Sequence, residues 1–400
     1  MAEDPRDWEP ATRLIRGGLA RSAHGETSEP IYLTQSFVYD SAESADARFA
    51  GQEEGYIYAR YGSPTVRMFE DRLALVEGAE ACRATASGMA AIHLCFMGLL
   101  RAGDHIVAGK ALFGSCRWLL NNWAPRFGIE ATLVDAPDLA AWRAAMRPNT
   151  KVVFIESPAN PLLEICDIAA ISAIAREVGA KVVVDNVFAT PIFQSPLKLG
   201  ADLVVYSATK HIDGQGRVLG GAVLGAQALI DESFRDLIRH SGPALSPFNA
   251  WVLFKSLETL DLRVRRQAET AAVLADVIAA HPKVRACRHP GRPDHPQHEI
   301  AVRQMSGPDN RRGGSTVVAM DLGSREAAFR FLNSLSLIDI SNNLGDAKTM
   351  ATHPTTTTHR AITEEQRLEI GLTPGWVRLS VGLEGVADLR RDIERSLDAA

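Results

Sequence analysis

Residues 182–210 read VVVDNVFATPIFQSPLKLGADLVVYSATK and contain two apolar runs, VVVD and DLVVYS. The apolar residues are consecutive and do not alternate with polar ones, which indicates strands buried on both faces, as in a parallel sheet. The first run ends at Asp185, and the second leads directly to Lys210. Because open parallel sheets bind ligands beyond the carboxyl ends of their strands, we expect this acid and this amine to face one crevice.

Similar apolar runs surround this stretch and alternate with helical patterns. The runs HIVAG, ATLVDA and KVVFIES predict strands, and GGAVLGAQALI predicts a further strand. Helices are predicted for AAWRAAM and AAISAIAREVGA, which lie between these runs. The alternation predicts an α/β fold with a large, mostly parallel sheet.

The remaining patterns divide the chain into three parts. Residues 1–60 form an extended N-terminal arm with one β-like run, IYLTQSFVY. Residues 61–255 form the α/β domain, which begins with a helix that Ser63 caps and Gly78 closes. A long helical pattern from Asn249 to about Ala280 leads into a smaller C-terminal α/β domain, residues 256–400. Its predicted elements are STVVAMDL, a helix near Glu326 to Leu335, LIDISNN, WVRLSVGL and a final helix.

The composition excludes several classes of protein. A chain of 400 residues with 46% hydrophobic and 23% charged residues can bury a large core without disulfides. The net charge of −5 leaves no electrostatic footprint for nucleic acid. No apolar run approaches the ~18 residues of a membrane span, and the acidic start MAEDPRDWEP is unlike a secretory signal. The five cysteines contain no C-x-x-C pair, which favours a reducing, cytoplasmic location.

Lys210 has two interpretations. Most lysines at such positions are surface residues that begin a loop. The alternative is a desolvated amine that forms a Schiff base, and the nearby hydroxyls of Ser207 and Thr209 and a glycine-rich segment favour it. An acid facing that lysine suits pyridoxal phosphate (PLP), which acts as an electron sink when an acid keeps its ring nitrogen protonated. We therefore predict that Lys210 and Asp185 bind PLP.

The phosphate of PLP requires hydrogen-bond donors, and the segment TASGMAAIHLCFMGLL offers them. Ser87, Gly88 and Met89 lead into a predicted helix, whose first N–H groups and dipole favour an anion. Taken alone, Gly88 is equally consistent with an ordinary turn glycine. The segment GQGRVLGG is no dinucleotide fingerprint, because its third glycine comes one residue late.

These motifs together resemble the cystathionine γ-synthase family, the Cys/Met-metabolism group of fold-type-I PLP enzymes. The resemblance runs from near Pro30 to Glu384. It rests on YIYARYGSPT, EGAEACRATASGMAAI, ESPANP, VVVDN, GADLVVYSATKHIDGQG, HPQHEIA, LGDAKTMATHP and VRLSVGLE. Within the family, YSATKHIDGQGRVLGG is most similar to the O-succinylhomoserine sulfhydrylase branch.

The resemblance implies a role for each matching residue. Lys210 would hold PLP, Asp185 would pair with its ring nitrogen, and Phe113 would stack on the ring. Glu156 and Asn160 would lie beside the ring. The phosphate would be bound by Ser87, Gly88, Met89, Ser207 and Thr209.

Other matching residues concern the substrate and a second subunit. Arg378 would clamp the α-carboxylate of the substrate, a bidentate task that suits a guanidinium, and Asn343 would assist it. Tyr58 and Arg60 would reach the phosphate of a neighbouring subunit, and members of the family are usually homotetramers.

The chain departs from the family pattern at three places. The stacking residue is commonly tyrosine, and Phe113 has no hydroxyl with which to exchange a proton. Asn343 stands where many relatives have serine, and Gly62 and Ser63 stand where asparagine is common. Without a phenol, Lys210 would carry more of the proton transfer.

The implied reaction replaces the succinate of O-succinylhomoserine by sulfide and gives homocysteine for methionine biosynthesis. Cystathionine γ-synthase, O-acetylhomoserine sulfhydrylase and methionine γ-lyase use the same chemistry and remain alternatives. Another class of alternative is a non-catalytic protein with the PLP-enzyme fold. A metal-binding module around His289, Asp294, His295 and His298 is disfavoured, because the spacing fits no zinc pattern, and we predict no metal site.

Overall fold

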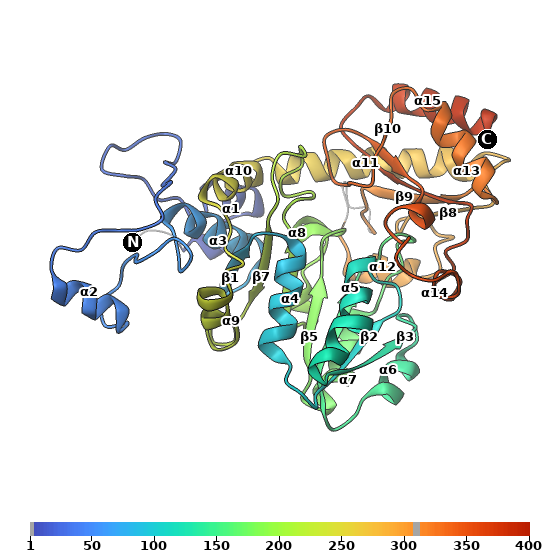
Figure 1. Ribbon diagram of the computed structural model, residues 1–400. Coiled ribbons are helices and arrows are strands. Elements are labelled where there is room, and N and C mark those ends of the chain that lie inside the picture. The colour runs from blue at the N-terminus through green and yellow to red at the C-terminus, as the bar shows by residue number, and fades with distance from the viewer. Residues whose placement is uncertain (1–3, 307–312) are drawn as a thin grey trace. The chain divides into compact units, whose positions relative to one another are not determined.

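The computed structural model describes residues 4–306 and 313–400, which form an α/β fold with two sheets (Figure 1). The larger sheet has seven strands in the order β1-β7-β6-β5-β4-β2-β3. Strand β2 pairs in parallel with β3 and β4, β4 pairs in parallel with β5, and β1 pairs antiparallel with β7. The strands span Ala81–Thr85 (β1), His105–Gly109 (β2), Glu130–Val134 (β3), Thr150–Glu156 (β4), Lys181–Asp185 (β5), Leu203–Ser207 (β6) and Gly221–Gly225 (β7). The predicted fold class, with its large and mostly parallel sheet, is confirmed.

The apolar runs predict strands β2 to β6 correctly, but two predictions near them are incomplete. The run GGAVLGAQALI is a strand only up to Gly225, since Gln227 begins helix α9, Gln227–Ser241. Glutamine, alanine and leucine favour a helix here, and the buried Ile230, Phe234 and Ile238 recur at helical spacing along one face. Strand β1 escapes notice because Arg83 interrupts its short apolar pattern.

Within the sheet, β2, β4 and β5 pack against helices α6, Leu139–Ala145, and α7, Ile168–Glu177. Each of these helices begins at an aspartate whose carboxylate accepts hydrogen bonds from first-turn N–H groups, Asp138 for α6 and Asp167 for α7. The apolar face of α7 packs Ile171 and Ile174 onto the valines of β4 and β5. These helices bury one face of the strands that end at Glu156 and Asp185.

The chain divides into two compact units that are not continuous in sequence. Unit 1 contains the chain up to Gly98 together with residues 205–213 and 217–259, and unit 2 contains residues 99–204, 214–216 and 260–400. The division into residues 1–60, 61–255 and 256–400 stays a prediction.

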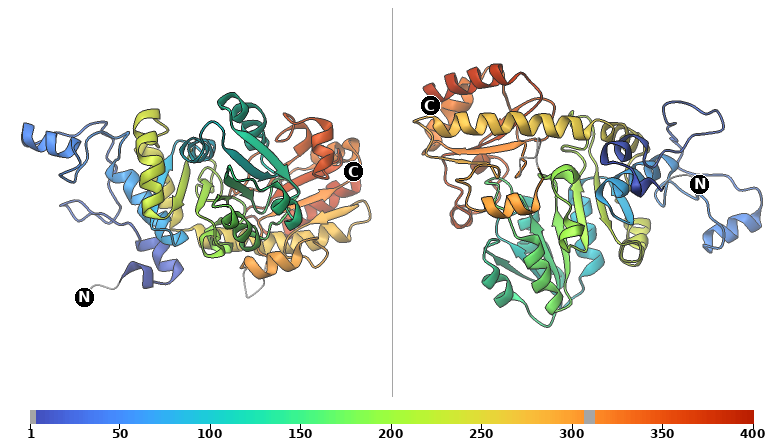
Figure 2. Two further views of the ribbon diagram at one scale, coloured as in Figure 1. Left: turned by 90° about the horizontal axis from the view of Figure 1, so that it is seen from below. Right: turned by 180° about the vertical axis from the view of Figure 1, so that it is seen from behind.

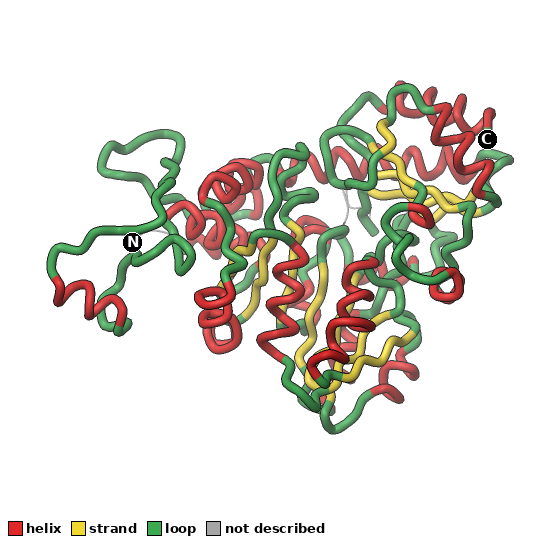
Figure 3. Tube along the Cα trace, in the orientation of Figure 1, coloured by secondary structure: helices red, strands yellow, loops and turns green. Residues whose placement is uncertain are grey.

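Unit 1 begins with an arm that is mostly loop (Figure 3). It contains helices α1, Pro10–Arg16, and α2, Ala42–Phe49, but IYLTQSFVY forms no strand. Its β-type pairing among the described residues is an isolated bridge from Ser36 to Tyr58. The β-like composition therefore does not produce a strand, because a strand requires a longer paired neighbour.

Helix α3, Pro64–Glu77, lies between Ser63 and Gly78 as predicted, but the hydroxyl of Ser63 makes no capping hydrogen bond. Pro64 occupies its first turn, and Gly78 closes it with a φ of 80°, a backbone conformation that favours glycine. The helix packs against α10, Pro247–Leu257, around the fully buried Arg72. The guanidinium of Arg72 donates to the backbone oxygens of Gly17, Ile15 and Phe254, which ties the arm to both helices. Unit 1 also contains helix α4, Gly88–Leu99, as far as Gly98.

Unit 2 contains the second sheet, with strand order β10-β11-β12-β9-β8. Three helices pack on this sheet (Figure 2): α11, Leu260–Ala280; α13, Arg325–Ser334; and α15, Val386–Ala399. The shared core contains Val318, Phe331, Val377, Leu379 and Ile393. The strands are Ala286–Arg288 (β8), Val317–Asp321 (β9), Asp339–Ile340 (β10), Met350–Thr352 (β11) and Trp376–Ser380 (β12). Short helices connect the elements of unit 2, Gly114–Trp118 (α5), Thr190–Phe193 (α8), His298–Gln304 (α12) and Glu364–Glu369 (α14).

The predicted long helix from Asn249 to Ala280 is two helices, α10 and α11. The break falls at Glu258 and Thr259, where the hydroxyl of Thr259 donates to the backbone oxygen of Ser256 at 3.4 Å. Such a local bond competes with the helical ladder, which explains the break. In the described part of the chain, no helix combines the length and apolarity that a membrane crossing requires.

Candidate active site

The loop after β6 holds Ser207, Thr209 and Lys210 in a defined turn of unit 1. The backbone N–H of Lys210 donates to the oxygen of Ser207 at 3.2 Å. The hydroxyl of Thr209 accepts from the backbone N–H of Gly220 at 3.1 Å and donates to its oxygen at 3.2 Å. These bonds fix the backbone from which the half-buried Lys210 side chain extends.

The start of helix α4 lies against this loop. A Cβ atom added at Gly88 would lie 2.5 Å from the Cβ of Ser207, so only glycine fits. The hydroxyl of Ser87 accepts a hydrogen bond from the N–H of Ala90 at 3.2 Å and thereby caps the helix. The N–H groups of Gly88 and Met89 belong to the first turn, where a helix offers them no acceptor. Unit 1 thus brings Ser87, Gly88, Met89 and Ser207 together. The first-turn N–H groups of α4 there are donors suited to an anion.

In unit 2, two carboxylates stand at the ends of neighbouring strands. Glu156 ends β4, Asp185 ends β5, and the two residues are paired across the parallel ladder. Glu156 accepts from the backbone N–H of Phe113 at 2.7 Å and from that of Asn160 at 2.8 Å. Both carboxylates are buried, and Glu156 fixes the segments that carry Phe113 and Asn160.

Burial raises the pKa of both carboxyl groups. The pKa of Glu156 rises to about 8, through burial first and the charge of Asp185 second, and the pKa of Asp185 rises to about 6 through burial. Asp185 accepts one hydrogen bond, from the N–H of Val187 at 3.0 Å. Within residues 4–306 and 313–400, no cationic side chain lies within ion-pair distance of it. A buried carboxylate in this state would gain strongly from a cationic ligand.

Arg378, in strand β12, is fully buried and bonded only to neutral oxygens. Its Nη1 donates to the Oδ1 of Asn160 at 2.9 Å, and its Nη2 donates to the backbone oxygens of Asn342 at 2.9 Å and Asn343 at 3.1 Å. Its Nε has no hydrogen-bond partner among the described residues. Burial lowers the pKa of Arg378 to about 10, so the guanidinium stays charged at neutral pH and retains a donor for an anion.

The buried His359 lies near this guanidinium, a residue that sequence reasoning did not select. Its Nδ1 lies 2.9 Å from the hydroxyl of Thr358. Burial first and the charge of Arg378 second lower the pKa of His359 to about 4. The imidazole is therefore neutral at physiological pH. The run TTTTH was the one available signal, and it resembles an ordinary loop.

The histidines around residues 289–298 do not form a metal centre. His289 and His295 approach the backbone oxygens of Ser315 and Leu163 through their Nε2 atoms, and His298 approaches that of Pro290 through Nδ1. Each imidazole is therefore engaged with the backbone of its own surroundings. No group of three metal-binding side chains occurs in the part of the chain that the structure describes.

Comparison with known proteins identifies the family. The family described as Cys/Met metabolism PLP-dependent enzyme matches residues 11–398. This chain belongs to that family. It is 52% identical over 392 residues to an O-succinylhomoserine sulfhydrylase of Mycobacterium tuberculosis, covering 97% of this chain and 95% of that protein. It is 42% identical over 393 residues to an L-methionine gamma-lyase of Pseudomonas putida, covering 98% of this chain and 97% of that protein.

A solved structure agrees with this assignment. A putative O-acetylhomoserine (thiol)-lyase of Campylobacter jejuni superposes with a TM-score of 0.93 at 30% identity, covering 98% of this chain and 100% of that chain. That structure contains a pyridoxyl-lysine monophosphate. The chain described here is thus a PLP-dependent enzyme of Cys/Met metabolism with the fold-type-I architecture.

The residues of this chain fit the family's cofactor on two structural grounds. Asp185 is buried and has no cationic partner in the described part of the chain, as suits an acid that pairs with a protonated pyridine nitrogen. The first turn of α4 is packed closely against Ser207, with free N–H groups that suit a phosphate. The first feature lies in unit 2 and the second in unit 1.

Proposed function

We propose that this chain is an O-succinylhomoserine sulfhydrylase, which replaces the succinate of O-succinylhomoserine by sulfide and forms homocysteine for methionine biosynthesis. The observation that carries this choice within the family is the full-length similarity to an O-succinylhomoserine sulfhydrylase. At 52% identity, it exceeds the 42% identity to a methionine gamma-lyase over the same length. Methionine gamma-lyase is therefore the second candidate.

PLP, when bound, supplies an electron sink for the charge that develops at the substrate's Cα. Lys210 would hold it covalently and, once released by the substrate's amino group, would move protons at Cα and Cβ. Asp185 would keep the ring nitrogen protonated, which its burial and lack of another cation support. Phe113 would stack on the ring without exchanging protons. Glu156 accepts hydrogen bonds from the backbone N–H groups of Phe113 and Asn160 and would hold both residues beside the ring. The phosphate would be bound by Ser87, Gly88, Met89, Ser207 and Thr209.

Arg378 would bind the α-carboxylate of the substrate. Its contacts with Asn160 and with the backbone of Asn342 and Asn343 orient the guanidinium but leave its charge uncompensated by any hydrogen-bonded acid. Asn343 would contribute to this site through its backbone oxygen, which orients the guanidinium of Arg378. A buried, oriented guanidinium binds a carboxylate more strongly than a solvated one.

We further propose that the enzyme is a homo-oligomer, most simply a tetramer, in which Tyr58 and Arg60 bind the phosphate on a neighbouring subunit. The arm that carries them exposes large apolar side chains, with Val38 95% and Leu33 70% exposed. Such exposure supports burial against another copy of the chain. The five cysteines are buried and unpaired, which supports a reducing location such as the cytoplasm.

A product assay tests the proposed reaction directly. The purified protein, supplied with PLP, should convert O-succinylhomoserine and sulfide into homocysteine. O-acetylhomoserine, cysteine in place of sulfide, and methionine alone serve as the competing substrates. Faster cystathionine formation from cysteine would indicate a cystathionine γ-synthase. Preferred cleavage of methionine would indicate the lyase, and turnover of none of these substrates would indicate a non-catalytic protein.

Substitution of Lys210 tests the proposed covalent attachment. Borohydride reduction should fix one PLP per chain in the wild-type protein and none in Lys210→Ala, as measured by intact mass. Lys198→Ala, which removes a lysine of the short helical turn Pro196–Leu199, should behave as wild type. Full covalent labelling of Lys210→Ala would refute the assignment.

Asp185→Asn tests the acid separately. This variant should bind PLP but lose turnover by about 10²-fold or more, because an amide cannot stabilise the protonated ring. Steady-state kinetics and the absorbance of bound PLP give the two readouts. Near-normal turnover with bound cofactor would rule out this role for Asp185.

A further inference from the structure

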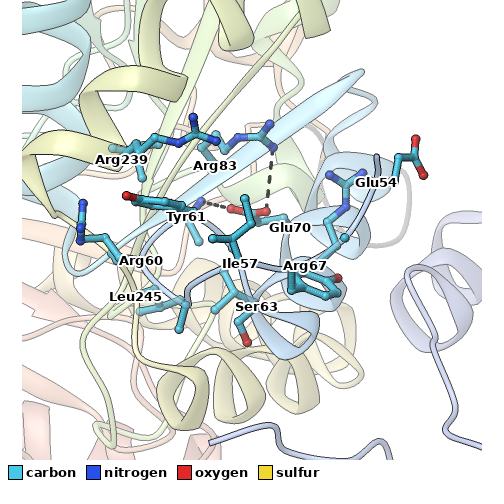
Figure 4. Close-up of a pocket in the computed structure, with 18 residues that line it drawn as sticks. Glu54, Ile57, Arg60, Tyr61, Ser63, Arg67, Glu70, Arg83, Arg239 and Leu245 are labelled. Atoms are coloured by element: carbon cyan, nitrogen blue, oxygen red, sulfur yellow. Dashed lines mark hydrogen bonds and ion pairs between the residues drawn. The ribbon is translucent and has the colours of Figure 1, made fainter. Parts of the chain in front are cut away.

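A cavity of about 620 Å³ lies within unit 1, and Lys210 is not among the residues that line it (Figure 4). The end of the arm, the start of α3, strand β1 and the end of α9 line it. Four arginines contribute to the lining, Arg60, Arg67, Arg83 and Arg239. Their pairing differs, and this difference indicates what the cavity binds.

Two of the four arginines are neutralised. Arg67 pairs with Asp71 at 2.7 Å, and Arg83 pairs with Asp231 at 3.0 Å. Arg83 also lies 4.0 Å from Glu70, and a dashed line marks this contact in Figure 4. The positive charge of these two side chains is therefore already compensated within unit 1.

Arg60 and Arg239 are different. Across the described residues, neither has a carboxylate within ion-pair distance. Both lie against the ring of Tyr61, with guanidinium carbons 4.9 Å and 4.7 Å from its centroid. Figure 4 shows them on different sides of that ring. Cation–π contact holds each guanidinium in place without reducing its charge.

Two uncompensated guanidiniums around one aromatic ring repel each other, and an anion between them would relieve that repulsion. The cavity also contains the hydroxyl of Ser63, which is 1% exposed and has no hydrogen-bond partner among the described residues. A buried hydroxyl without a partner carries a desolvation cost that a polar ligand would remove. Glu54 and Glu70 also line the cavity, and Glu70 lies against the paired Arg83, so the uncompensated Arg60 and Arg239 are the groups that favour an anionic ligand.

The proposed function supplies such an anion. O-succinylhomoserine ends in a carboxylate that O-acetylhomoserine lacks, and both molecules are esters of the same homoserine. The arm residue Arg60, proposed above to bind phosphate on a neighbouring subunit, lies against the same ring as Arg239. The cavity would therefore face the neighbour's active site.

We propose that Arg239 reads the terminal carboxylate of the succinyl group of a substrate held on the neighbouring subunit, with Tyr61 as the platform that orients its guanidinium. This inference rests on the proposed function. According to this proposal, the preference for the succinyl donor comes from α9 and the arm. Arg239 is a specificity-determining residue, and the chemistry at Cα and Cγ does not depend on it.

Arg239→Gln should separate the two acyl donors. We expect kcat/KM for O-succinylhomoserine to fall about 10- to 100-fold, the range for losing a charge-assisted hydrogen-bonded pair. The value for O-acetylhomoserine should stay within about 2-fold of wild type. Arg239→Lys should recover part of the loss, since it retains the charge. The matched control is Arg235→Gln, one turn earlier on α9 and exposed, which should change neither value.

The phosphate of PLP is a competing source of the same anionic chemistry, and cofactor affinity distinguishes it. Arg60→Gln should weaken PLP binding, whereas Arg239→Gln should leave the dissociation constant of PLP unchanged. Weaker PLP binding in Arg239→Gln, or equal losses with both acyl donors, would overturn the proposal. A wild-type enzyme that turns over neither donor would instead refute the proposed function on which it rests.

Subunit mixing tests whether Arg239 acts on a neighbouring copy. Lys210→Ala and Arg239→Gln chains, unfolded and refolded together, form mixed assemblies. If Arg239 acts across the interface, about a quarter of the sites regain both residues, and activity with O-succinylhomoserine rises well above that of either variant alone. Activity no higher than the average of the two separate variants would show that Arg239 acts within its own chain and would overturn the proposal.

Discussion

Glu70 lies in helix α3, where its Oε1 accepts a hydrogen bond from the backbone N–H of Ala84 at 2.7 Å. Burial raises the pKa of its carboxyl group to about 7, although Arg83 and the hydrogen bond from Ala84 oppose this shift. The folded state therefore favours the protonated form of Glu70 more than the unfolded state does. Below the unfolded-state pKa, Glu70 is protonated in both states and does not make the free energy of unfolding depend on pH. As the pH rises through the folded-state pKa of about 7, the ionisation of Glu70 lowers the free energy of unfolding.

Glu70→Gln should remove this pH dependence. The amide retains an oxygen that can accept from Ala84 but cannot ionise. At pH 5 the variant and the wild type should differ little, and at pH 8.5 the variant should be more stable by about 1–3 kcal/mol. Urea unfolding at the two pH values measures the difference. A stability difference that does not change with pH would contradict the explanation.

The site residues differ in how far the sequence could identify them. Asp185 and Lys210 follow buried strands directly, so strand patterns alone predict their positions at the sheet edge. Arg239 belongs to a helix whose charged residues resemble an ordinary solvated face. Its lack of an acid partner, and its contact with Tyr61, depend on a packing that brings residues 61 and 239 together.

At the scale of elements, the packing of α4 against the loop after β6 requires glycine at position 88. Gly88→Ala would place a Cβ 2.5 Å from that of Ser207 and 2.8 Å from its Cα. Because the second contact is with the backbone, the helix has to shift. We expect a loss of about 1–3 kcal/mol in the free energy of unfolding and weaker binding of PLP.

Gly385→Ala is the matched control, since Gly385 is the N-cap of α15 and, like Gly88, lies at the start of a helix. There the added Cβ would meet only the flexible carboxylate of Asp388 at 3.2 Å. This variant should lose less than about 1 kcal/mol and retain cofactor affinity. Urea unfolding and PLP titration measure both effects. If Gly88→Ala matched the control, Gly88 would be an ordinary turn glycine.

Helix and strand boundaries show which elements depend on local sequence. Strands β2, β4, β5 and β6 are long apolar runs, and α3 has a proline start and a glycine end, so local chemistry predicts them. Strands β8 and β11 have three residues each and carry no periodic signal. They exist because β9 and β12 offer edges with which they pair.

At the scale of the whole molecule, the arm is the part whose apolar residues are least covered. Val38, Leu33 and Phe49 are 95%, 70% and 62% exposed. Val38→Asp should weaken the proposed self-association by about 10-fold or more, because the interface would have to bury a charge. Sedimentation velocity over a dilution series measures the assembly mass. Activity that depends on Tyr58 and Arg60 should fall together with that mass.

Gln52→Asp adds the same charge at an exposed polar position of the arm and should leave the assembly intact. If both variants kept the wild-type mass, the arm would not be an interface. If the wild type itself were monomeric and fully active, the proposed contribution of Arg60 and Arg239 to a neighbouring site would also fail.

The sequence by itself determined the α/β class, the parallel strands, and the acid and amine that follow two of them, because these features depend on runs of neighbouring residues. The tertiary structure alone decided which charges are compensated. Among the described residues, Arg378 donates to neutral oxygens, Asp185 has no cation within ion-pair distance, and Arg239 lies against Tyr61 without an acid partner. Ion pairing and burial depend on residues far apart along the chain, and local patterns carry no information about which of them meet.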